Sequence, residues 1–307
     1  MDMNKILIWI FFLLSMGATE AAAPTTAGDR IILGPEQSVK SENAAIYTSS
    51  DSLTVTRLLA GARKAKSTPN WMIYFARQLR GVPYVAQTLE KNQKEQLVIN
   101  LRQLDCTTYV ENVAALSLCM KNQRYTFDDF CNFLRHLRYQ DGIVGYPTRL
   151  HYFTAWIDNN KKSGFVKEEI QAPNPPFTKV QTIRINYMTQ HISRYPMLKQ
   201  NPEWVKEIHE SENKYNGQRF RYIPKTLIAN TKLFRETIHD GDIIAILTNK
   251  QGLDTSHIGI AVWHKDGLHL LNASMVRHQV VEEPWTLQYY MSRHPSQTGI
   301  RVIRMAL

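Results

Sequence analysis

Two short segments far apart in the chain carry the residue types of a nucleophile and a base. The first, Leu104-Asp105-Cys106-Thr107-Thr108-Tyr109-Val110-Glu111, contains Cys106, and the second, Ser256-His257-Ile258-Gly259-Ile260, contains His257. A thiol becomes a good nucleophile when a helix N-terminus and a nearby imidazole lower its pKa. A lone Cys followed much later by a His is the order found in papain-like sites. The pair therefore indicates amide hydrolysis through a cysteine nucleophile.

The neighbouring residues predict how each group is positioned. Asp105 and Thr107-Thr108 are residue types that start helices, so Cys106 should lie on a first helical turn, where unpaired N–H groups stabilise a thiolate. His257 should project from the start of a strand, and Gly259 would let a helix approach that strand closely.

A third group has to orient the imidazole. Asn272 and His269 both lie on the next predicted strand, and their three-residue separation places them on opposite faces, so only one can serve. Papain-like sites commonly use Asn, because it accepts from the ring N–H without changing its own charge. The residues alone leave both choices open.

Hydrophobic spacing predicts helices on both sides of the nucleophile. Two helices should follow Thr54, the second ending before Gly81, and a longer one should span 107–120. Thr126 with the acidic pair after Phe127 predicts an N-cap and first turn for a helix that reaches about residue 137. Two further helices are expected over about 148–160 and 202–214.

Strands dominate the C-terminal third of the chain. Apolar runs at 242–247, 257–263, 268–273 and 300–306 predict strands, and Lys265-Asp266-Gly267 predicts a hairpin turn between the second and third. A short extended segment is expected at 97–101. Helices that carry the nucleophile, followed by an antiparallel sheet that carries the base, predict an α+β domain over 53–307, with a large insertion at about 121–235.

The first residues have the features of a cleaved signal peptide over 1–23. Lys5 precedes an apolar run from Ile6 to Leu14, and small residues follow up to Ala23. The run is too short to span a bilayer, so no stable membrane insertion is expected after cleavage. We therefore expect a periplasmic protein in which residues 24–52 form a flexible lead-in.

An odd number of cysteines in an exported chain leaves at least one unpaired. Cys106 and Cys119 would lie about 19 Å apart on one helix, far beyond disulfide reach. Cys119 could meet Cys131 across a helix–helix turn, but we expect both to be buried free thiols.

The formal net charge of the chain, +10 at pH 7, suggests an acidic partner. The basic residues are scattered and form no nucleic-acid-binding motif, so no nucleic acid is expected. Anionic cell-wall material or a membrane surface fits an exported protein better, with a merely soluble basic surface as the alternative. The chain has no His-Glu-x-x-His run and no Cys-x-x-Cys pair, so we expect no metal and no cofactor in the chemistry.

Several motifs together resemble the NlpC-type cell-wall cysteine hydrolases, which are papain-like enzymes. Gly81-Val82-Pro83-Tyr84 is similar to the family's Gly-x-Pro-Tyr, and 105–110 is similar to its Asp-Cys-Ser-x-Phe-Val. Asp240-Gly241-Asp242-Ile243 and 257–260 resemble its Pro-Gly-Asp-Leu and His-Val-Gly-Ile. Asn272-Ala273-Ser274 stands where the family has His-Ala-Ser, which favours Asn272 over His269. The resemblance covers roughly 55–305 and implies a papain-like core.

The resemblance implies a role for each matched residue. Cys106 would attack the carbonyl, His257 would accept and return the proton, and Asn272 would hold the imidazole. Tyr84 would place its hydroxyl near the oxyanion, beside the Cys106 N–H, or would simply pack at a turn. Asp105 is a substrate-binding position in the family's peptidases, and Thr107 replaces the family's Ser at the other.

The variant Cys-Thr-Thr-Tyr-Val-Glu motif and the Arg149-Leu150-His151-Tyr152 segment are most similar to a branch formerly of unknown function. That branch implies an N-acetylmuramoyl-L-alanine amidase acting on peptidoglycan or soluble muropeptides, and a monomer is expected. The insertion is expected to build the substrate cleft, with these further lining residues: Arg149, His151, Tyr152, Arg219, Tyr222 and Ser256.

The sequence leaves two other activities and one non-enzymatic function open. An endopeptidase that cuts after γ-D-Glu would use the same residues, as would an acyl-transferring enzyme of the transglutaminase kind. A cell-wall binding protein without activity would be expected to lack a catalytic residue, whereas the Cys, His and Asn are all present.

Overall fold

The first five helices precede all the strands along the chain, and the later helices lie between strands. The computed structural model describes residues 45–65, 70–169 and 175–307, and these residues all belong to one compact unit. The predicted signal peptide and most of the predicted lead-in lie outside the described residues. The last lead-in residues, 49–52, already belong to the first helix.

Five helices form the layer that carries Cys106, and their bounds are α1 Ser49–Arg63, α2 Trp71–Gln78, α3 Cys106–Lys121, α4 Phe127–Arg138 and α5 Phe153–Lys162. Capping boxes at Thr48, Asp105 and Thr126 start α1, α3 and α4, because each side chain accepts a backbone N–H that the helix leaves unpaired. The predicted helices after Thr54, over 107–120 and after Thr126 are confirmed.

The helix predicted over 148–160 begins later than expected, at Phe153. Arg149 forms a β-bridge with Tyr139, and its guanidinium is buried in ion pairs with Glu90 and Glu95. These contacts hold residues 148–152 out of the helix. Pairing with distant residues therefore overrides the local helical spacing.

The strands form one sheet in the order β2-β3-β8-β4-β5-β6-β7, and β1 also pairs with β8. Every pairing is antiparallel. The bounds are β1 Val166–Glu168, β2 Lys179–Thr182, β3 Arg219–Pro224, β4 Ile243–Thr248, β5 Thr255–Trp263, β6 Leu268–Ser274, β7 Gln279–Glu282 and β8 Gln297–Met305. The predicted strands β4, β5, β6 and β8 and the hairpin turn are confirmed, and the α+β class is correct.

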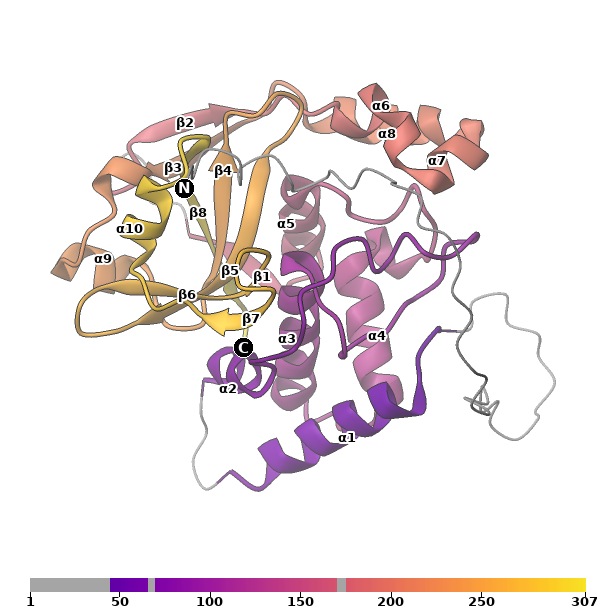
Figure 1. Cartoon of the computed structure of the whole chain (residues 1–307), viewed down its shortest axis with the longest axis horizontal. Helices are drawn as coiled ribbons and strands as arrows, with labels where there is room; N and C mark the ends of the chain where they lie inside the picture. Colours follow the sequence, from indigo (N-terminus) through magenta and orange to yellow (C-terminus); the bar gives the residue numbers. More distant parts are fainter. Residues whose placement is uncertain (1–44, 66–69, 170–174) are drawn as a thin grey trace, which may run out of the picture. The chain divides into compact units, whose positions relative to one another are not determined.

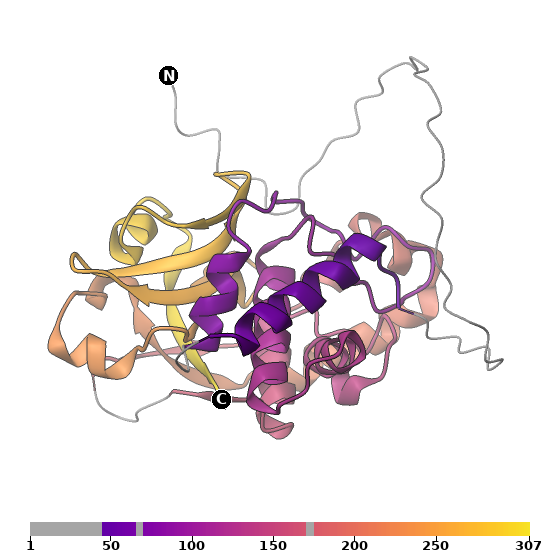
Figure 2. The same cartoon turned by 90° about the horizontal axis from the view of Figure 1, so that it is seen from below.

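The sheet separates two hydrophobic cores. One lies between the sheet and α1 to α5, and α3 packs directly against β5 and β6 (Figure 1). The indigo helix α1 lies across α3 and α4 on that side (Figure 2). The second core lies on the other sheet face, beneath α9 (Lys232–Thr237) and α10 (Leu287–Ser292). Cys106 and His257 therefore come from two elements that pack on each other.

The segment expected as one insertion serves two different parts of the fold. α4, α5 and β1 contribute to the same core as α3, and β3 joins the sheet beside β8. In contrast, α6 (Tyr187–Gln190), α7 (Pro196–Gln200) and α8 (Pro202–Tyr215) gather around a separate small core, to which Tyr152 and Ala155 also contribute. Short 3-10 helices span Gln140–Gly142, Ile192–Arg194 and Lys225–Leu227.

Within the described ranges, the helices are all too short or too polar to cross a membrane.

Candidate active site

Cys106 is the first residue of α3, directly after the N-cap Asp105. The Asp105 carboxylate accepts from the Thr108 backbone N–H at 2.8 Å, and the Thr108 hydroxyl accepts from the Asp105 N–H at 2.9 Å. This reciprocal cap fixes the backbone of the first turn of α3, and it thereby fixes the direction in which the Cys106 side chain points. The expected placement of Cys106 at a helix start is correct.

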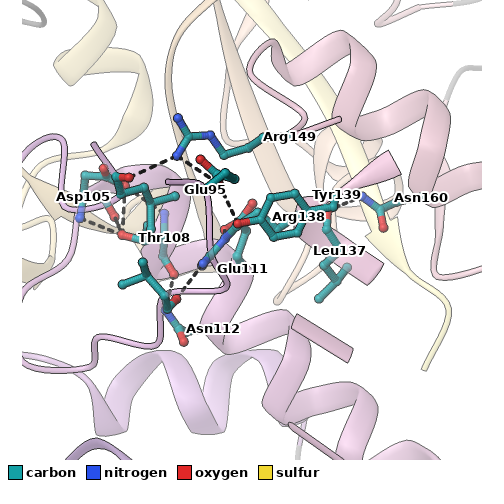
Figure 3. A network of polar contacts seen from close by, with 12 residues as sticks. Glu95, Asp105, Thr108, Glu111, Asn112, Leu137, Arg138, Tyr139, Arg149 and Asn160 are labelled. Atoms are coloured by element: carbon teal, nitrogen blue, oxygen red, sulfur yellow. Dashed lines mark hydrogen bonds and ion pairs between the residues drawn. The ribbon is translucent and has the colours of Figure 1, made fainter. Parts of the chain in front are cut away.

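A buried ion-pair network anchors the first turns of α3 (Figure 3). Glu111, one of the buried residues of α3, accepts from Arg138 at 2.7 Å, and Arg138 also donates to the Val98 carbonyl at 2.6 Å. Arg149 forms the adjoining pairs with Glu90 and Glu95. Because these charges are paired inside the protein, the helix that presents Cys106 cannot shift without exposing or unpairing one of them.

The Cys106 thiol lies half-buried against the start of β5. The backbone N–H groups of Ile258 and Thr107 and the Thr107 hydroxyl face the sulfur and favour its ionised form. Burial and the neighbouring Asp105 carboxylate outweigh them and raise the pKa of the Cys106 thiol to about 12. The Cys106 thiol is therefore protonated at rest, and it would need a base to act as a nucleophile.

His257 supplies a neutral imidazole at the start of β5, next to the residue whose N–H meets the thiol. Burial lowers the pKa of His257 to about 4, against the opposing effect of its bond to Asn272. The Nε2 atom of His257 lies 3.0 Å from Asn272 Oδ1. An imidazole that donates from Nε2 keeps an unprotonated Nδ1, which can accept the thiol proton.

The orientation of the Asn272 amide follows from its second contact. Asn272 Nδ2 faces the Leu270 carbonyl at 3.4 Å and Glu283 Oε1 at 3.5 Å, and both of these can only accept. The Asn272 carbonyl oxygen is therefore the atom that faces His257. His269 lies on the same strand but bonds to the Glu283 carbonyl and to Asp266, so the structure brings Asn272, and not His269, to His257.

Gly259 allows a close approach, but from a strand. A Cβ atom at position 259 would stand 2.7 Å from Leu270 Cγ and 2.9 Å from the Leu271 carbonyl oxygen. The nearest atoms at this position belong to β6, the strand that carries Asn272, and α3 also packs against β5.

Tyr84 is tied to the approach of the nucleophile helix. Leu104 donates to the Pro83 carbonyl and Val85 donates to the Leu104 carbonyl, each at 3.0 Å, which lays Tyr84 alongside Leu104. Burial raises the pKa of Tyr84, and the nearby Cys106 and Asp105 add to the shift. The hydroxyl therefore stays protonated and can donate a hydrogen bond near the sulfur.

Several of the predicted lining residues have partners of their own within the fold. Arg149 is buried in its ion pairs, Tyr152 donates to Glu212 at 2.7 Å, and His151 bonds to the Tyr146 carbonyl at 2.8 Å. Ser256 is buried against the Ile246 carbonyl. Arg219 and Tyr222 lie on β3, three strands away from β5.

Two residues near the triad were not predicted. Glu283 is buried beside Asn272, and the ring of Tyr290, on α10, lies 6.4 Å from the ring of His257. Burial raises the pKa of Tyr290 to about 12, so its hydroxyl also stays protonated. Neither residue lies in a recognisable motif. Only the position of Glu283 just after a strand that follows Asn272 could have suggested it.

The fold and the site together define an α+β protein in which Cys106, at a helix start, lies beside the strand of an antiparallel sheet that carries His257, and His257 in turn contacts Asn272. The AmiA-like family, described as N-acetylmuramoyl-L-alanine amidase-like, matches residues 74–300. The chain belongs to this family of peptidoglycan-related amidases.

Solved structures agree with that assignment. A Bacteroides uniformis N-acetylmuramoyl-L-alanine amidase is 36% identical with a TM-score of 0.71, and the match covers 77% of this chain and 99% of that one. A Bacteroides fragilis protein whose name proposes a xylanase is 38% identical with a TM-score of 0.69, covering 75% of this chain and 98% of that one.

A third structure supports the fold alone. It is a Legionella pneumophila protein of the DUF1460 family, 22% identical with a TM-score of 0.64, and the match covers 83% of this chain and 94% of that one. The comparison with curated proteins found no match.

Proposed function

We propose that the protein is a cysteine amidase that hydrolyses the amide bond between N-acetylmuramic acid and L-Ala in soluble peptidoglycan fragments. The observation that carries this proposal is the position of Cys106, at the start of α3, beside the Ile258 N–H of β5, because the residue before Ile258 is His257, which contacts Asn272, in a chain of an amidase-like family. The packing of α3 on β5 and β6 also supports a papain-like core.

The first half of the reaction forms a thioester. Cys106 Sγ attacks the lactyl carbonyl carbon of the sugar while its proton moves to His257 Nδ1. The Cys106 backbone N–H and the Tyr84 hydroxyl donate to the oxyanion. Collapse of the intermediate breaks the C–N bond, and His257 returns the proton to the departing L-Ala amine.

The second half releases the sugar. Water gives a proton to His257 Nδ1 and attacks the thioester carbon. The C–S bond then breaks and His257 returns the proton to the sulfur, which leaves a lactyl carboxylic acid and the Cys106 thiol. Asn272 accepts from His257 Nε2–H throughout, so it steadies the imidazolium in both halves. Asp105 and Thr107, which flank the nucleophile, are the proposed substrate-binding side chains.

A glycosidase activity, as the name of the Bacteroides fragilis relative proposes for that protein, fits this site poorly. Glycoside hydrolysis needs two carboxyl groups on either side of the bond. The carboxyl groups near the triad, Asp105 and Glu283, are held by the helix cap and by Asn272. The side chains that remain suit acyl transfer.

Mass spectrometry of the protein with a disaccharide tetrapeptide tests the proposal. Free disaccharide plus intact tetrapeptide is the expected result, and it should disappear in Cys106→Ala. A sugar that keeps L-Ala-γ-D-Glu would identify an endopeptidase instead. A product joined to an added amine would identify acyl transfer, and no cleavage would leave a cell-wall binding protein.

The chain offers a matched control for the nucleophile. Cys131 is a second half-buried free thiol, on α4, and burial raises its pKa to about 12 as well. Cys131→Ala removes a thiol of similar exposure and should leave the cleavage rate within about twofold of the parent. Equal loss in both variants would count against Cys106 as the nucleophile.

We also propose export to the periplasm, which the pattern of residues 1–23 supports. Expression in a Gram-negative host should yield a periplasmic protein whose intact mass corresponds to a chain that begins at Pro24. Recovery of the uncleaved chain from the cytoplasm would contradict this.

A further inference from the structure

The turn between β5 and β6 carries three metal-binding residue types that the proposed reaction does not use. His264 follows β5, Asp266 lies in the turn, and His269 is the second residue of β6. One ligand atom from each of the three lies within 4.8 Å of the other two. All ten histidines of the chain are among the described residues, and this is the group of three that they form with Asp, Glu or Cys.

The Nε2 atom of His269 faces a carboxylate oxygen without a proton of its own to donate. Its side chain is 2% exposed, and Nδ1 lies 2.8 Å from the Glu283 carbonyl oxygen, which can only accept, so Nδ1 carries the proton. Nε2 of the neutral ring is then an acceptor, yet it faces Asp266 Oδ1 at 3.1 Å. Two acceptors at that distance need a proton or a metal ion between them.

The distance between His269 Nε2 and Asp266 Oδ1 matches the separation of two ligand atoms bound to one metal ion. Ligands at 2.0–2.1 Å around a tetrahedral zinc ion stand about 3.3 Å from each other, and those of an octahedral ion stand about 3.0 Å apart. The separation of 3.1 Å between His269 Nε2 and Asp266 Oδ1 lies between these values. The Nδ1–H bond to a backbone carbonyl is also the usual outer contact of a metal-bound imidazole.

His264 is placed to complete the set. Its Nε2 lies 2.7 Å from Glu282 Oε1, so a carboxylate holds the outer nitrogen and leaves Nδ1 as the free ligand atom. The His264 ring stacks on His269 with centroids 4.1 Å apart, and it must tilt out of this stack to direct Nδ1 at a shared ion. Its side chain is 37% exposed at the end of the hairpin, which leaves room for that rotation.

We propose that His264, Asp266 and His269 form a binding site for a divalent transition metal, with Zn²⁺ as the reference ion. Two imidazoles and one carboxylate suit zinc, nickel or copper and disfavour Mg²⁺ and Ca²⁺, which take oxygen ligands. The bound ion would join the β5–β6 turn to the segment of Glu283. Because Glu283 contacts Asn272, the ion would steady the strand pair that supports the triad without touching the reacting atoms.

Titration of ZnCl₂ into the Cys106→Ala protein tests the site. The alanine background is needed because Cys106 and His257 could bind zinc themselves. Isothermal calorimetry should show one tight site, and zinc at about 100 times its Kd should raise the Tm by about 5 °C. MgCl₂ at the same concentration should change neither readout.

Exposed ligands provide variants that keep the fold. Asp266→Asn, at a side chain 64% exposed, and His264→Gln should each weaken zinc binding at least about tenfold, whereas the exposed His239→Gln should bind as the parent does. Cobalt should give a visible absorption band that Asp266→Asn removes. No zinc binding, or equal binding by the parent and both ligand variants, would overturn the proposal. These readouts do not depend on amidase activity.

Discussion

Asn272 Oδ1 lies 3.0 Å from His257 Nε2, while Asn272 Nδ2 faces the buried Glu283 carboxylate. The two contacts fix each other, because only the amide oxygen can accept from the ring and only the amide nitrogen can donate to Glu283. The result is an imidazole held in the tautomer that keeps Nδ1 free. Asn272, held by Glu283, thus sets the tautomer of the imidazole that is the proposed base.

Asn272→Ala should lower kcat/KM for a disaccharide tetrapeptide about 10- to 100-fold, because a hydrogen bond to the developing imidazolium is lost. KM should change little, since Asn272 does not contact the substrate in the proposed reaction. Steady-state kinetics measures the change, and the Tm of the variant serves as the control for folding. An unchanged kcat would mean that the tautomer is set by another group.

The raised pKa of Cys106 predicts slow alkylation of the resting enzyme. Iodoacetamide reacts with the thiolate, so the rate of Cys106 labelling should keep rising with pH beyond 9 and show no plateau near pH 7. Labelling followed by intact-mass spectrometry in a Cys131→Ala background gives the profile. A plateau between pH 5 and 8 would instead reveal a stable thiolate–imidazolium pair.

The lowered pKa of His257 predicts acid sensitivity with a definite sign. The folded protein favours the neutral imidazole, so this contribution to stability is fully present above the unfolded pKa of about 6.5 and is lost as the pH falls toward 4. The Tm of the wild type should therefore drop more steeply between pH 6.5 and 4 than that of His257→Gln. Parallel curves would show that His257 does not titrate differently in the folded state.

Tyr84→Phe isolates the hydroxyl next to the nucleophile. Loss of one oxyanion donor should lower kcat about 100-fold and leave KM nearly unchanged, because the bond strengthens only as charge develops. Tyr290→Phe, which removes the other protonated hydroxyl near the triad, is the comparison variant and should cost less than about tenfold. Equal effects would assign the oxyanion contact to both residues.

The positions of Cys106 at a helix start and of His257 at a strand start were predictable because each lies in a local pattern. Asp105 and Thr108 form a cap that depends on residues three positions apart, and the strand that begins near His257 follows from alternating and β-branched residues. The same is true of α4, whose capping box starts at Thr126. Where residues close in the sequence decide the local structure, that structure could be predicted from the sequence.

Other residues take their roles from contacts that no local pattern contains. Arg149 was expected to line the cleft, yet it is buried against Glu90 and Glu95, which lie more than 50 positions earlier. A buried guanidinium requires such charged partners, and the sequence around Arg149 does not indicate which residues they are. Strand β3 was missed although Arg219-Phe220-Arg221-Tyr222 alternates charged and aromatic residues, and only the last two residues of the strand are buried.

The pair of Glu111 and Arg138 provides the sharpest test of how α3 is held. Both side chains are almost fully buried, at 3% and 2% exposure, and they meet at 2.7 Å. Arg138→Met leaves the Glu111 carboxyl buried without its partner, so it should cost about 3–5 kcal/mol and lower the Tm by about 10 °C. The double change Glu111→Leu with Arg138→Met should recover part of that loss, since no charge is left unpaired. Lys206→Met, which breaks the exposed pair with Glu210, is the matched control and should shift stability by less than about 1 kcal/mol. If Arg138→Met were no more damaging than Lys206→Met, the buried network could not be what fixes the helix that presents Cys106.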